Sequence, residues 1–238
     1  MNLSIETQTI IDKIHSETKP ISIFIYCSRA RNDWQKESDY EIGIIYDKNH
    51  YVQRKDLADF HQLKYLNLFP FLYEDFIDLK LDTPFPKSIY LRDLILSAMT
   101  IKGKAVVEKL FPPPIRLTDL LEGISFQLGY ALAATHSYKQ GDLVTSASHF
   151  VKSFMNGLKI LVIVKKGKFP LTFNEIVDGG KSLLPPGEIR SLVTQVIKVR
   201  GGQRPDLNTL FLNISFLNTI VSKNIKTELQ KSDRIVIP

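Results

Sequence analysis

The chain has 238 residues, of which 44% are hydrophobic and 24% charged, a composition typical of one or two globular domains and not of a disordered or fibrous chain. Its single cysteine, Cys27, excludes an internal disulfide and a cysteine-rich zinc site, and it fits a reducing, cytoplasmic compartment. The formal net charge of +6 favours anionic partners such as nucleotides, although a bias of this size is also common in proteins that bind none. The longest mainly apolar run, residues 158–164, is too short to span a bilayer, so no membrane partner is expected.

Helices and strands alternate over the first 110 residues. Apolar residues spaced by threes and fours predict helices, and alternating or continuous β-branched runs predict strands. The predicted order is a helix over 3–14, strands over 21–27 and 40–47, a helix over 54–66, a strand over 75–83, a helix over 88–99 and a short strand over 104–110.

Three consecutive prolines, Pro112–Pro114, exclude a helix and predict an extended connector. After them the strand signal disappears. The patterns there predict helices over 116–140 and 141–166, one opened by the capping box of Thr172 and Glu175, one over 185–199 and a last one over 205–231. The predicted fold class is therefore α+β: a mixed sheet with flanking helices over residues 1–110, a proline-rich linker over 111–116, and an all-α helical bundle over 117–238.

Two acids, Asp39 and Glu41, stand at the start of the second predicted strand. Alternate residues of a strand share a face, so their Cα atoms should lie roughly 6.5–7 Å apart. Two carboxylates held this way repel each other unless a cation, a proton or solvent intervenes. Mg²⁺ accepts one or two carboxylates and leaves its other positions to water and phosphates. The alternative is a solvated acid pair at the start of an ordinary strand, or an acid pair that is matched by nearby lysines.

The loop that precedes these acids carries the opposite charge. Ser28, Arg29 and Arg31 follow the strand that ends at Cys27. A serine hydroxyl and backbone N–H groups at such a turn suit a phosphate, and the two arginines add positive charge beside it. A nucleoside triphosphate bound through Mg²⁺ needs both kinds of group.

The segment "CSRARNDWQKESDYEIGII" resembles the signature of the DNA polymerase beta-type nucleotidyltransferase superfamily, especially its minimal nucleotidyltransferases. That signature is a hydrophobic residue, Gly-Ser, about ten residues, then Asp, a hydrophobic residue, Asp or Glu, and another hydrophobic residue. The positions that match in place are Ser28, Arg29, Ala30, Arg31, Asp33, Trp34, Ser38, Asp39 and Glu41. The family's order of helix, strand, loop, strand, helix and strand also fits the chain to about Leu110.

The resemblance implies a role for each matching residue. Ser28 would hold the β- and γ-phosphates of a nucleoside triphosphate, with Arg29 and Arg31 beside it, and Asp39 and Glu41 would bind Mg²⁺. The family's third catalytic and metal-binding acid stands on the next strand, where "FIDLKL" offers Asp78, with Asp75 and Asp82 as substitutes. The implied reaction is attack of an acceptor hydroxyl on the α-phosphate, with release of pyrophosphate. The acceptor would be a small molecule, a protein or an RNA.

The chain also departs from the signature. Cys27 replaces the first glycine and Asn32 the later one. These changes keep a second interpretation open, a catalytically degenerate protein that binds a nucleotide or a partner protein. The helical half is similar to the bundles of kanamycin nucleotidyltransferase and of HEPN domains, and a paired helical domain implies a possible homodimer.

Overall fold

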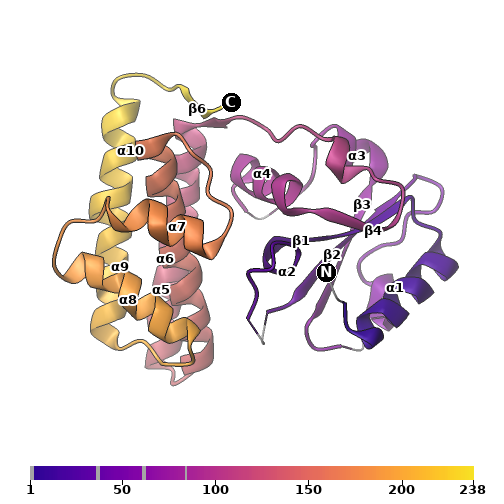
Figure 1. Cartoon of the computed structure of the whole chain (residues 1–238), viewed down its shortest axis with the longest axis horizontal. Coiled ribbons are helices and arrows are strands. Elements are labelled where there is room, and N and C mark those ends of the chain that lie inside the picture. The colour runs from indigo at the N-terminus through magenta and orange to yellow at the C-terminus, as the bar shows by residue number, and fades with distance from the viewer. Residues whose placement is uncertain (1–2, 36–37, 61–62, 84) are drawn as a thin grey trace. The chain divides into compact units, whose positions relative to one another are not determined.

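The computed structural model describes residues 3–35, 38–60, 63–83 and 85–238. The chain forms two compact units, one of Met1–Pro84 and Tyr90–Pro112 and the other of Phe85–Ile89 and Pro113–Pro238. We call them the α/β unit and the helical unit; Figure 1 shows β1, β2, β3 and β4 in the first and the long helices α5 and α6 in the second. Phe85–Ile89 groups with the helices, whereas the sequence placed it within residues 1–110.

The α/β unit is built on a four-stranded sheet of order β3-β2-β1-β4. β2 runs antiparallel to β1 and parallel to β3, so the sheet is mixed, as predicted. β1 also pairs antiparallel with β4. The strands are β1 (Ser22–Tyr26), β2 (Tyr40–Tyr46), β3 (Leu66–Leu72) and β4 (Met99–Gly103).

Helices cover both faces of this sheet. The helix α1 (Ile5–Thr18) begins at Ser4, whose side chain caps Thr7, and it buries Ile11 and Ile14 against one face. The other face is covered by α3 (Tyr73–Ile77) and by the part of α4 (Lys87–Ser97) that belongs to this unit. Rings dominate there: Phe24, Phe71 and Phe76 lie within 6.1 Å of one another between centroids.

Three predicted elements of this unit are wrong. The expected helix over 54–66 is only a 3₁₀-helix at Asp56–Phe60, followed by β3, and its residues 61 and 62 lie outside the described part. The expected strand over 75–83 falls on α3 and the turn after it. The last strand, β4, precedes the expected range of 104–110, where the chain instead forms the 3₁₀-helix Val107–Lys109.

The helical unit follows the predicted order of helices. Its elements are β5 (Ile115–Arg116), α5 (Leu117–Lys139), α6 (Leu143–Lys166), α7 (Phe173–Lys181), α8 (Glu188–Arg200), α9 (Leu207–Ser215), a π-helical stretch (Phe216–Val221), α10 (Ser222–Leu229) and β6 (Ile235–Ile237). The predicted capping box is present: the Thr172 side chain accepts a hydrogen bond from the backbone N–H of Glu175, and the Glu175 side chain accepts one from the backbone N–H of Thr172.

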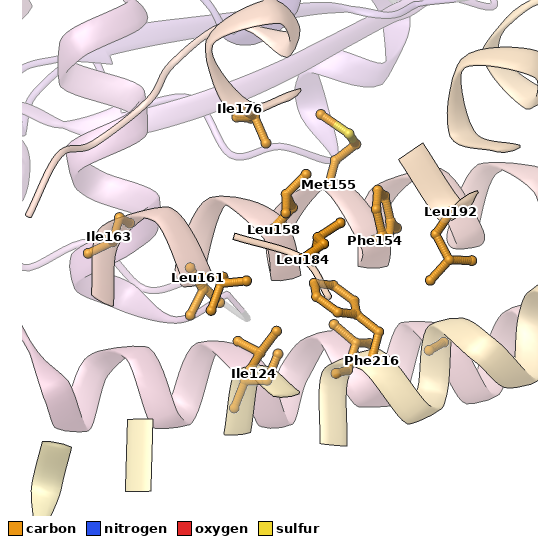
Figure 2. Close-up of a cluster of buried hydrophobic side chains, with 14 of the residues drawn as sticks. Ile124, Phe154, Met155, Leu158, Leu161, Ile163, Ile176, Leu184, Leu192 and Phe216 are labelled. Atoms are coloured by element: carbon orange, nitrogen blue, oxygen red, sulfur yellow. The ribbon is translucent and has the colours of Figure 1, made fainter. Parts of the chain in front are cut away.

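α6 forms the centre of the helical unit. Figure 2 shows its side chains Phe154, Leu158 and Leu161 gathered with residues of other helices such as Ile124 and Phe216. By length and composition α6 is apolar enough to cross a membrane, but 67% of its most apolar window is buried inside the protein. Packing in the core therefore accounts for its apolar character.

A two-stranded sheet joins the start of the helical unit to a much later segment. β5 pairs antiparallel with β6, with Ile115 opposite Ile237, and both isoleucines are buried in the main core. Asp233 accepts hydrogen bonds from the backbone and hydroxyl of Thr118. The sequence predicted neither strand, because each is too short to show alternation.

Candidate active site

The carboxylates of Asp39 and Glu41 lie close together at the start of β2. Asn67 on β3 donates from its Nδ2 to Asp39 Oδ2 at 3.1 Å and to Glu41 Oε1 at 3.3 Å. The parallel register places Asn67 directly beside Glu41. Because alternate residues share a face, Asp39, Glu41 and Asn67 all project from the same side of the sheet, as predicted for the two acids.

Two tyrosines stand beside Glu41. Tyr26 is its partner across the β1–β2 ladder, and the hydroxyl of Tyr26 lies 3.5 Å from that of Tyr90 on α4. Burial raises the pKa of Tyr90 to about 12, with further contributions from the charges of Cys27, Glu41 and Asp93. Burial also raises the pKa of Tyr26. Both phenols therefore stay protonated at neutral pH and remain hydrogen-bond donors near the carboxylates.

The chain turns sharply between β1 and the following short helix, α2 (Cys27–Ala30). Cys27 has a left-handed backbone with φ of 63°, and its N–H donates to the Ser97 hydroxyl at 3.0 Å. Asn32, after α2, has φ of 56°. These are the two positions at which the resembling signature carries glycine. The backbone at both positions is thus of the kind that favours glycine, although neither residue is one.

Arg29 closes the loop between α2 and β2. Its Nε and Nη2 both donate to the carbonyl oxygen of Ser38, at 3.0 and 2.8 Å. Its guanidinium also lies over the rings of Trp34 and Tyr40, 4.0 and 4.4 Å from their centroids. These contacts hold the residue just before Asp39. They favour a positioning role for Arg29 over the predicted contact with phosphate.

The side chains of Arg31 and Ser28 have fewer hydrogen bonds within the protein than that of Arg29. Arg31 Nη1 lies 3.4 Å from Asp93 Oδ2, and its Nε is buried with no hydrogen-bond acceptor among the described residues. Ser28 is half-buried in α2, and its carbonyl accepts from the N–H of Asp33. A buried guanidinium N–H donates most readily to an anionic oxygen.

Asp78 lies away from this pair of acids. It ends α3, and its carboxylate is 2.7 Å from Lys80 Nζ in an exposed ion pair. α3 follows the Leu72 end of β3, about 17 Å along the strand from Asn67 by the usual rise per residue. The strand predicted to carry Asp75, Asp78 and Asp82 does not form. The neighbour of Glu41 on the next strand is Asn67 instead.

Two carboxylates stand at the start of β2, and the Asn67 amide presents its Nδ2 to both of them. Carboxylate oxygens are hard ligands of the kind that Mg²⁺ prefers, and a nucleotide's phosphates would supply further oxygen ligands. No group of three His, Cys, Asp or Glu suited to a metal occurs in the part of the chain that the structure describes. The residues present therefore fit a magnesium ion that shares its coordination with a substrate.

No protein-family model matches the chain, and no curated protein does. Among solved structures it is similar to the spectinomycin adenyltransferase AAD(9) from Enterococcus faecialis, crystallised with ATP and spectinomycin. The TM-score is 0.60 at 12% sequence identity, and the match covers 93% of this chain and 97% of the adenyltransferase. The match thus includes both the sheet and the helices that follow. The chain shares the fold of this adenyltransferase, an α+β unit followed by a helical one.

Proposed function

We propose that the protein is a nucleotidyltransferase that moves a nucleoside monophosphate from a nucleoside triphosphate to an acceptor hydroxyl. The observation that carries the proposal is the convergence of Asp39 and Glu41 on one amide, in a fold shared with an adenyltransferase. The loop that precedes them has a matching signature and brings Ser28 and Arg31 from the end of β1.

The described residues divide the work of binding and orientation. Asp39 and Glu41 would hold Mg²⁺, which would neutralise charge on the phosphates and on the attacking and leaving oxygens. Ser28 and the buried Nε of Arg31 face the phosphates, and Arg29 holds the loop that carries Asp39. The proposed site leaves out Asp78, because that residue follows α3, which begins at the Leu72 end of β3, whereas Asn67 beside Glu41 lies at the other end.

The reaction is a single in-line displacement. The acceptor oxygen forms a bond to the α-phosphorus while the bond from that phosphorus to the bridging oxygen of the β-phosphate breaks. Pyrophosphate leaves with the bonding electrons, and the hydroxyl proton is released to water. Because the similar adenyltransferase was crystallised with ATP and spectinomycin, ATP and a small hydroxyl-bearing molecule are the first donor and acceptor to test. If the acceptor is a protein or an RNA, label from the α-phosphate would appear in the protein or the RNA of a cell extract.

A second candidate is a nucleotide-binding protein without transferase activity. It is favoured by Cys27, whose Cβ and sulfur stand at the turn where the signature has glycine. Homodimerisation through the helical unit and similarity of its helices to HEPN-type bundles stay predictions under either candidate.

The first testable prediction concerns transfer of label. With ATP labelled in its α-phosphate, Mg²⁺ and a panel of aminocyclitol and sugar acceptors, the wild-type chain should form a labelled product. The Asp39→Asn variant should lose this activity about a hundredfold or more, the scale expected when a preorganised charged group is removed. Omission of Mg²⁺ should have the same effect.

Asp47→Asn is the matched control, because Asp47 lies past the opposite end of β2 and caps a turn at Asn49 and His50. Thermal unfolding with Mg²⁺ and each nucleotide separates the two candidates, since a ligand stabilises the state it binds. Stabilisation without any transfer would favour the binding protein. If the nucleotides cause no stabilisation and no label is transferred, both candidates are refuted.

A further inference from the structure

Asn67 occupies a defined place in the candidate site. It is the second residue of β3, and the parallel pairing sets it beside Glu41 on the strand that carries both acids. Leu66 and Leu68 on either side are buried in the opposite face of the sheet. Their burial fixes the register, so the side chain of Asn67 can only point to the face of Asp39 and Glu41.

The amide makes two hydrogen bonds from one nitrogen. Nδ2 carries two protons, and its neighbours are Asp39 Oδ2 at 3.1 Å and Glu41 Oε1 at 3.3 Å. This arrangement offsets the repulsion between the carboxylates when no cation lies between them. Asn67 is therefore suited to keep the acid pair assembled in the metal-free protein.

The same amide can serve when a cation is present. The last torsion of an asparagine side chain is soft and roughly two-fold, so a half-turn exchanges Nδ2 with Oδ1. A cation between the carboxylates would repel the NH₂ group and attract the carbonyl oxygen. Side-chain amide oxygens are regular ligands of hard cations.

Charge distinguishes this site from one with three acids. Asp39 and Glu41 supply two negative charges, and the third group is neutral. A carboxylate at position 67 would add a third charge, which at a separation of 4 Å from a divalent ion is worth about 2 kcal/mol even in the dielectric of water, or roughly thirtyfold in affinity. With a neutral amide at position 67, the additional negative charge that attracts the divalent ion has to come from the phosphates of the ligand.

We infer that Asn67 is the third protein group of the divalent-cation site, and that its neutrality makes the site take up the cation together with a triphosphate instead of alone. The inference rests on the proposed nucleotide site at Asp39 and Glu41. It names the residue that links metal binding to nucleotide binding there.

Manganese provides a probe that needs no turnover. Free Mn²⁺ is measured by electron paramagnetic resonance as the protein is titrated, and the binding of an α,β-methylene analogue of ATP is measured by calorimetry at saturating Mn²⁺. Wild type, Asn67→Asp and Asn67→Leu are compared, because the three side chains are close in size. Asn49→Asp, on the exposed turn after β2, controls for added charge.

Wild type should bind Mn²⁺ weakly alone and much more tightly with the analogue. Asn67→Asp should bind Mn²⁺ alone at least tenfold more tightly, so its gain on adding the analogue should be smaller. Asn67→Leu should lose about three- to tenfold in affinity for Mn²⁺ and for the Mn²⁺-loaded analogue. Asn49→Asp should match wild type.

Wild-type affinities in folded Asn67→Leu would overturn the inference, even if Asn67→Asp bound more tightly, because added charge alone would explain that gain. If Asn67→Leu fails to fold, Asn67→Ala takes its place with the same expected loss. Failure of the wild type to bind both Mn²⁺ and the analogue would refute the proposed function itself. The two failures are thus distinguishable.

Discussion

The two units of the molecule depend on different interactions. In the helical unit, α6 is surrounded by apolar side chains, and Phe150, Phe154 and Phe216 form a row of rings in its core. In the α/β unit, the start of β2 is organised by polar contacts: the Arg29 guanidinium on Ser38, the Asn67 amide on two acids and the Ser97 hydroxyl on Cys27. Apolar burial gives stability without direction, whereas hydrogen bonds fix the positions of individual atoms.

This difference predicts where each kind of substitution acts. Loss of volume in the helical core should change the free energy of unfolding and leave metal binding intact. Loss of a polar contact near β2 should lower the free energy of unfolding less, and should lower the affinity for the metal and nucleotide more. Three substitutions test this division, in order of decreasing effect on stability.

Phe154→Ala should have the largest effect on stability. Phe154 is fully buried on α6 and contacts Phe150 and Phe216, so truncation leaves a cavity that costs about 3–5 kcal/mol. Chemical denaturation followed by circular dichroism measures the loss. Phe211→Ala is the control, because Phe211 is 49% exposed in the same unit, and its effect should stay within about 0.5 kcal/mol. Equal losses in the two variants would contradict the assignment of the core.

Arg29→Ala should have an intermediate effect. It removes two charge-assisted hydrogen bonds to Ser38 and two ring contacts, for a loss of about 1–3 kcal/mol. Because Asp39 follows Ser38, affinity for Mn²⁺ with nucleotide should fall in the same variant. Arg29→Lys should not restore it, since an ammonium cannot reproduce the planar two-nitrogen contact. Full activity in Arg29→Lys would show that charge alone is needed there.

Cys27→Gly should have the smallest effect, and it should be stabilising. Relief of the left-handed backbone is worth about 1–2 kcal/mol, against about 0.5–1 kcal/mol for the greater freedom of glycine in the unfolded chain. Asn32→Gly should gain less, because asparagine tolerates this backbone better. Cys27→Ala keeps the strain and loses the same sulfur contacts that Cys27→Gly loses, so it should be less stable than both the wild type and Cys27→Gly. Urea denaturation of the three variants gives the ranking, and a loss on Cys27→Gly would contradict it.

The sequence predicted the helical unit well because its signals are local. α5 and α6 each have an apolar stripe, and the capping box at Thr172 marks the start of α7. The α/β unit was harder to predict. Leu57, Phe60 and Leu63 are spaced as on a helix, and Pro70 argues against a strand, so β3 was missed. β3 lies at the edge of the sheet, where a proline without an N–H is tolerated.

The same error hid part of the candidate site. Asp39 and Glu41 lie on one strand, so their common face followed from the alternation of residues. Asn67 comes from the missed strand, and only the β2–β3 register brings it to the two acids. The resemblance implied Asp78 instead, because it places the third acid on the next strand and "DFIDLKL" alternates as a strand does. In the structure, Phe76 packs in the ring cluster on the sheet and the segment forms α3. Only pairing between distant segments distinguishes the two residues.

The short β5–β6 ladder has a mechanical consequence. Since Ile115 lies opposite Ile237 in an antiparallel pair, tension applied between residues 113 and 238 would load the ladder from one end and open its bonds one after another. A zipper geometry of this kind yields at low force, whereas strands pulled lengthwise past each other resist. Single-molecule stretching with handles at those two positions should therefore release β6 first, before any helix of the unit uncoils.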